Sequence, residues 1–169
     1  VAKSHKASKI LGSIGSRPID RVVGLDAFDV LTAARARAHL QLGGMTSSHA
    51  IRFRDKLAMR DVAHKAGLLV PDFVHVLNYD ELRDYMSRVP PPWVMKPRAD
   101  VSAVGIKKLH QAEQVWRAID ELDRRESLRE KSPYYLLERY VPGDVFHVDS
   151  LVENGEVIFE EEGEKLCLI

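Results

Sequence analysis

The most constraining stretch of this sequence is a short apolar run that lies between prolines and ends in a lysine. Trp93-Val94-Met95 follows Pro91-Pro92 and precedes Lys96-Pro97. A run of this kind is typical of a strand that is buried on both faces. The lysine must reach water or an anion, because burying an unpaired ammonium group is costly. Residues 105–109 predict a second strand, so the pair is either a hairpin that binds phosphate or a surface hairpin whose Lys96 extends into solvent.

Bulk properties exclude several classes of protein. The 169 residues suffice for one good core or two small ones, and 25 basic residues balance 25 acidic ones. We therefore expect no nucleic-acid partner and no membrane partner. The single cysteine, Cys167, cannot form an internal disulfide, which suits the cytoplasm. No apolar run approaches the roughly 18 residues that span a bilayer, and the start at Val1 suggests an excerpt from a longer chain.

The first 44 residues predict only part of a domain. Residues 1–17 are basic and rich in turn formers, which is typical of a flexible arm. Residues 21–25 predict a brief strand and residues 28–42 a helix that Gly43-Gly44 terminates. One strand–helix unit cannot bury both of its faces alone, so we interpret residues 1–44 as an arm and the end of a preceding α/β domain.

A single helix is predicted over residues 48–66, capped by Ser48 and terminated at Gly67. Its beginning is strongly basic, because it carries Arg52, Arg54, Lys56 and Arg60. Cations near a helix N-terminus oppose the macrodipole unless an anion lies close by. An anion site and a solvated face are both open interpretations.

The rest of the chain alternates between strands and helices. Asn78 is predicted to cap a helix over residues 79–86, and a longer helix is predicted over residues 112–128. Strands are predicted over residues 73–76, 134–141, 146–153 and 156–160. The last two form a hairpin around Asn154-Gly155, and residues 160–164 are expected to be a solvated acidic turn.

Three of these segments together resemble a known family. They are residues 54–60 followed by 66–71, the run of residues 93–97, and residues 137–144. Their order and spacing resemble those of the ATP-grasp family of carboxylate–amine and carboxylate–thiol ligases, over about residues 52–159. The resemblance implies an α+β fold, with a small lobe over residues 45–137. Residues 138–169 would be the truncated start of the large lobe.

The resemblance also implies a nucleotide site. Lys56 and Lys96 stand where the family has its two phosphate-binding lysines, which suit a triphosphate because they add charge-assisted contacts. Residues 98–104 correspond to the lid over the phosphates, for which Ser102, Ala103 and Gly105 supply the small residues. Compared with the family, this lid is poor in glycine, which suggests a modest affinity for triphosphate.

The base and the ribose are expected at the strand over residues 134–141. Glu138 would accept a hydrogen bond from the adenine amino group, and the backbone of Arg139 and Val141 would meet the ring at an unpaired strand edge. Val94 and Met95 would form an apolar wall. Asp144 stands near the position of the ribose contact, but the family commonly has two acidic residues there and this chain continues with Val145.

The implied cofactors are ATP and Mg²⁺. The metal ligands of the family are expected downstream of Ile169, so we assign none in this chain. His147 and Asp149 share one face of their strand, where they either face the nucleotide or pair with each other.

The implied reaction is activation of a small carboxylate as an acyl phosphate for attack by an amine or a thiol, and we expect this chain alone to be inactive. The alternatives are a non-catalytic nucleotide-binding or regulatory module and an α+β interaction domain without a nucleotide. Open strand edges favour a homo-oligomer.

Overall fold

The structure is a computed structural model that describes residues 18–99, 105–125 and 135–164. It has the mixed helix and sheet architecture that the sequence predicts, with one four-stranded sheet and one two-stranded ribbon. The four-stranded sheet has the order β1-β4-β2-β3, and all its pairings are antiparallel. Its strands are β1 (Phe73–His75), β2 (Trp93–Pro97), β3 (Lys107–Leu109) and β4 (Tyr135–Arg139).

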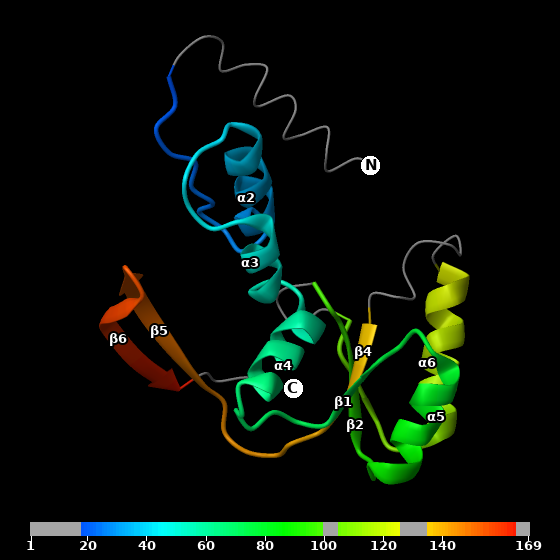
Figure 1. The fold of residues 1–169 in the computed structure, drawn as a ribbon. Helices are drawn as coiled ribbons and strands as arrows, with labels where there is room; N and C mark the ends of the chain where they lie inside the picture. Colours follow the sequence, from blue (N-terminus) through cyan, green and yellow to red (C-terminus); the bar gives the residue numbers. More distant parts are fainter. Residues whose placement is uncertain (1–17, 100–104, 126–134, 165–169) are drawn as a thin grey trace.

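Helices cover both faces of this sheet (Figure 1). Helices α5 (Tyr79–Arg88) and α6 (Ala112–Arg125) lie on one face, and α4 (Lys56–Lys65) lies on the other. Helices α2 (Val30–His39) and α3 (Ser47–Arg52) extend from the N-terminal end of α4. No helix in the described part of the chain is both long enough and apolar enough to cross a membrane.

The hydrophobic core lies between the sheet and the helices α5 and α6. Side chains alternate between the two faces of a strand, and Trp93, Met95 and Leu137 all point into this core. The other buried members of the cluster are Val76, Leu82, Tyr85, Val89, Leu109, Val115, Ala118 and Ile119. The alternate residues of β2 and β4 therefore point to the opposite face of the sheet, away from this core.

Sequence signals that act through contacts between residues a few positions apart predicted their elements correctly. The Asn78 side chain accepts hydrogen bonds from the backbone N–H groups of Asp80 and Glu81, at 3.0 and 3.4 Å, and α5 begins after it. The hairpin of β2 and β3 forms as predicted, with Trp93 opposite Leu109.

Two predictions for the N-terminal half were wrong. Residues 21–25 form no strand, because a strand needs a partner and the described residues provide none there. The helix predicted over residues 48–66 is two helices, α3 and α4. Thr46 caps α3 instead of Ser48, and Asp55 caps α4 by accepting from the N–H groups of Leu57 and Ala58.

The ribbon consists of β5 (Phe146–Glu153) and β6 (Glu156–Glu164). Its turn forms at Asn154-Gly155 as predicted, with φ angles of 52° and 87°, which favour asparagine and glycine. The acidic residues from Glu160 onwards are exposed where the structure describes them, but they lie in β6 instead of a turn. The sequence did not predict that β6 continues through these acidic residues, because they show no alternation of apolar and polar side chains.

Candidate functional site

The face of the sheet under α4 carries an ion-paired cluster. Lys96 on β2 and Glu138 on β4 point to this face, because each follows a core-facing residue by one position. In the register, Glu138 lies opposite Val94 and Leu136 lies opposite Lys96. Lys96 and Glu138 are thus diagonal neighbours on one face, within reach of each other.

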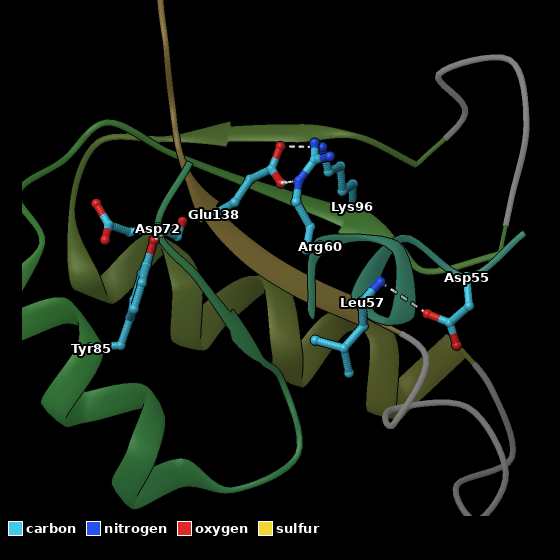
Figure 2. A network of polar contacts seen from close by, with 7 residues as sticks. All are labelled: Asp55, Leu57, Arg60, Asp72, Tyr85, Lys96 and Glu138. Atoms are coloured by element: carbon cyan, nitrogen blue, oxygen red, sulfur yellow. Dashed lines mark hydrogen bonds and ion pairs between the residues drawn. The ribbon is translucent and has the colours of Figure 1, made fainter. Parts of the chain in front are cut away.

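Glu138 binds two cations, Lys96 and Arg60, one at each carboxylate oxygen (Figure 2). Lys96 Nζ donates to Glu138 Oε1, and Arg60 Nε of α4 donates to Glu138 Oε2 at 3.3 Å. The side chains of Glu138, Lys96 and Arg60 are 8%, 12% and 23% exposed. A carboxylate buried to this degree needs such partners, since an unpaired buried charge is costly. We call these three residues the Glu138 triad.

The triad carries a formal excess of positive charge. Two cations share one carboxylate, and the three side chains lie on a partly enclosed face of the sheet. An anion that approached this face would find N–H donors already in place, without first having to order them. The donor set therefore fits phosphate oxygens.

Lys56 lies next to this site. It is the first residue of α4 and precedes Arg60 by four positions, so both side chains project from the same face of the helix. Its backbone N–H donates to the carbonyl of Arg98 at 2.8 Å, two residues beyond Lys96. The structure thus brings the start of α4 to the end of β2, where the two predicted phosphate-binding lysines lie on neighbouring segments.

A second ion pair lies at the same junction. The Arg98 guanidinium binds both carboxylate oxygens of Asp55. Burial alone would raise the pKa of the Asp55 carboxyl. The hydrogen bonds and charge of Arg98, with the N–H groups of Ala58 and Leu57, outweigh burial and hold the pKa below its ordinary value. Asp55 is therefore ionised at neutral pH.

The other residues predicted for the site do not form a cluster with these side chains in the described structure. Gly105 lies in an exposed turn with a φ of 78°, just before β3. Val141 and Asp144 lie beyond the end of β4 and are exposed. Ser102 and Ala103 lie outside the described residues, as does most of the predicted lid.

The expectation that Arg139 and Val141 lie on an unpaired strand edge was wrong for Arg139. Strand β4 lies inside the sheet, between β1 and β2, and the Arg139 N–H donates to the carbonyl of Asp72 at 2.9 Å. The same carbonyl accepts from the Tyr85 hydroxyl at 2.8 Å (Figure 2). Burial, with the nearby charges of Asp72 and Glu138, raises the pKa of Tyr85 far above its usual value, so the hydroxyl stays a donor. The backbone N–H groups of Arg139 and Tyr140 are therefore already paired, the latter with the carbonyl of Pro92 at 3.0 Å.

The structure contradicts the Met95 part of the predicted apolar wall, and the Val94 part stays a prediction. Val94 is on the face of the triad, but Met95 points into the core and is only 1% exposed. The two residues are adjacent in a strand, so they cannot share a face. Arg60 was recognised only as part of a basic helix, because nothing in the sequence links it to a carboxylate 78 positions away.

No set of three or more His, Cys, Asp or Glu side chains able to hold a metal ion occurs within residues 18–99, 105–125 and 135–164. The side chains of His147 and Asp149 contact each other on the ribbon, with Nε2 and Oδ2 3.7 Å apart.

Comparison with known proteins gives a consistent result. No family model matches the chain. A curated L-arginine-specific L-amino acid ligase from Bacillus subtilis is 22% identical over 142 residues, which is 84% of this chain and 34% of that protein. The crystal structure of an L-amino acid ligase from Bacillus licheniformis superposes with a TM-score of 0.74 at 19% identity, over 92% of this chain and 37% of the other. The chain has the ATP-grasp fold.

A more distant match extends the comparison to another enzyme. It is the biotin carboxylase domain of 2-oxoglutarate carboxylase from Hydrogenobacter thermophilus, a dimer in complex with MgADP, ADP and bicarbonate. It superposes with a TM-score of 0.60 at 17% identity, over 87% of this chain and 33% of that one. The chain spans about a third of the length of these relatives. The resemblance read from the sequence is thus confirmed for the part of the ATP-grasp fold that this chain contains.

Proposed function

We propose that this chain is the ATP-binding portion of a ligase that activates a carboxylate as an acyl phosphate. The observation that carries the proposal is the Glu138 triad, in which Lys96 and Arg60 share one buried carboxylate beside the start of α4. Lys56 and Lys96 would bind the phosphate oxygens, whose negative charge grows as the phosphoryl group is transferred. The named functions of the relatives, amino acid ligation above all, support the reaction class.

The reaction of the whole protein would proceed in two steps. A carboxylate oxygen attacks the γ-phosphorus of ATP, a new O–P bond forms, and the bridging P–O bond breaks to release ADP. An amine or a thiol then attacks the acyl carbon and inorganic phosphate leaves. Magnesium would supply neutralisation of the negative charge of the phosphates.

Glu138 would have two tasks in this site. Its oxygens hold Lys96 and Arg60 in place, and each oxygen has a second lone pair that can accept from an amino group of the base. Val94, opposite Glu138 in the register, provides apolar surface on the same face. Arg139 is the last residue of β4, and Val141 and Asp144 lie on the segment that follows it, towards which the ring and ribose would extend.

Nucleotide binding can be tested by thermal melting of the 169-residue chain with and without millimolar Mg-ATP. A ligand that binds only the folded state stabilises it by roughly 2.7 kcal/mol at a hundredfold excess over its dissociation constant. Lys96→Met should abolish the shift. The matched control is Lys65→Ala, which removes an exposed lysine from α4 and should leave the shift unchanged. An unchanged melting curve for the wild type, or an equal shift for Lys96→Met, would contradict the proposal.

Catalysis is a separate question from binding. We expect the isolated chain to bind ATP without ligating an amino acid to an amine, and the release of phosphate with a panel of amino acids measures this. Ligation by residues 1–169 alone would refute the view that the chain is one portion of the enzyme.

A further inference from the structure

A polar cluster apart from the Glu138 triad joins the start of α4 to the end of β2. It centres on Asp55 and Arg98, which lie 43 positions apart in the sequence. Their side chains are 12% and 21% exposed. An ion pair with so little exposure differs from the usual surface pair, which solvent and salt weaken.

The two segments are held to each other by crossed contacts. The Arg98 side chain binds the Asp55 carboxylate through two nitrogens, with Nε 3.0 Å from Oδ1. In the opposite direction, the backbone N–H of Lys56 donates to the backbone carbonyl of Arg98 at 2.8 Å. Two planar groups joined by two bonds fix an orientation as well as a distance.

Each partner is also fixed within its own neighbourhood. Asp55 Oδ1 caps α4 through the backbone N–H of Leu57, at 2.9 Å (Figure 2). Arg98 Nη1 lies 3.0 Å from Nε2 of His75 on β1. The pair therefore connects the first turn of a helix to two strands of the sheet.

The position of the pair along the chain gives it a consequence for the site. Lys56 directly follows Asp55, and Lys96 precedes Arg98 by two residues. These are the two lysines that the proposed function assigns to the phosphates. Any shift of α4 along the sheet would change the separation of their ammonium groups, and a site for a triphosphate tolerates little misplacement.

We propose that Asp55 and Arg98 are positioning residues that hold Lys56 and Lys96 at the separation required to bind one triphosphate. This inference rests on the proposed function, because it concerns the same site. Asp55 accepts hydrogen bonds and carries a negative charge, so it repels phosphate and acts only through its neighbours. Arg98 has most of its N–H donors directed at Asp55 and His75.

The test uses conservative substitutions that each remove one property of the pair. Asp55→Asn keeps a good helix cap, since asparagine and aspartate are nearly equal at this position, but it removes the charge that Arg98 binds. Arg98→Lys keeps the positive charge but loses the planar fork that binds both oxygens. The double variant closes a thermodynamic cycle.

Binding of ATP to the 169-residue chain and its variants is measured by titration calorimetry, below the melting transition of each. Each single variant should weaken binding about tenfold, which corresponds to about 1.4 kcal/mol. The double variant should be no weaker than either single one, because both break the same link. The control Asp61→Asn breaks an exposed pair with Lys65 on the same helix and should bind within twofold of the wild type.

The outcomes separate the two proposals. A wild-type chain without affinity for ATP overturns both the proposed function and this inference. A wild type that binds, with Asp55→Asn equally tight, overturns the inference alone. Weak binding by Arg98→Lys beside normal binding by Asp55→Asn also overturns it, because Arg98 would then contact the phosphate directly. If Arg98→Lys does not fold, Asp55→Asn decides alone.

Discussion

Replacing Glu138 with glutamine should destabilise the protein strongly, although the two side chains have nearly the same shape. The amide cannot balance the charge of Lys96 or Arg60, whose side chains are only 12% and 23% exposed. Removing one partner of a buried ion pair costs about 3–5 kcal/mol, because the remaining charge is left uncompensated. Arg60 retains some contact with solvent and the amide oxygen still accepts a hydrogen bond. We therefore expect the lower end of this range, about 3 kcal/mol.

Urea denaturation measures this loss directly. Circular dichroism follows the helices, and the fluorescence of Trp93, which is 3% exposed, and of Trp116, which packs against the core, reports on the core. With a slope of about 2 kcal/mol per molar urea, the midpoint should fall by about 1.5 M. The slope itself should not change, since the native fold is kept.

A triple variant separates stability from binding. Arg60→Met, Lys96→Met and Glu138→Leu together replace the triad with apolar side chains of similar volume, a kind of change that is often neutral or stabilising. We expect a midpoint near that of the wild type and no effect of ATP on the melting temperature. A Glu138→Gln midpoint within 0.3 M of the wild type, on the order of 0.6 kcal/mol, would refute the burial and pairing described for this carboxylate.

Three further outcomes follow from single contacts. Asp55 has a native pKa below its ordinary value of 3.8, so its stabilising effect is complete above that pH and is lost as the pH falls through the native pKa. The difference in unfolding free energy between wild type and Asp55→Asn should be constant from about pH 5 to 7 and shrink below about pH 4; a gap that widens in acid would contradict this. Asn78→Ala should cost about 1 kcal/mol by urea titration, because α5 loses its cap. Leu82→Ala should cost about 3 kcal/mol, whereas Leu69→Ala, at a fully exposed position, should change stability by less than about 0.5 kcal/mol; equal effects would be inconsistent with the core.

The sequence predicts those parts of the fold whose causes lie close together in the chain. Asn78 predicts the start of α5, and Asn154-Gly155 predicts the turn of the ribbon. The prolines on either side of residues 93–96 predict the ends of β2. Each signal acts through contacts a few residues away. The same rules were wrong at residues 21–25, where a strand pattern lacks a partner strand among the described residues.

The site depends on contacts that no local pattern encodes. Lys96 and Glu138 were predicted from the resemblance to a family, and the structure places them in contact. Arg60 and the link between Asp55 and Arg98 were missed, since they join segments 78 and 43 positions apart. Asp55 also shows why the predicted helix was too long, because a charged cap in the middle of a helical pattern starts a new helix.

Strand β4 places residues of opposite character at successive positions. Leu137 points into the core and Glu138 towards α4, and the antiparallel pairing with β1 and β2 fixes both orientations. A shift of this strand by one residue would place the Glu138 carboxylate in the hydrophobic core and would turn Leu137 towards Lys96 and Arg60. The strand should therefore accept conservative substitutions more readily than a single-residue deletion or insertion between residues 135 and 139. A shift of one position there would disrupt the core and the Glu138 triad together.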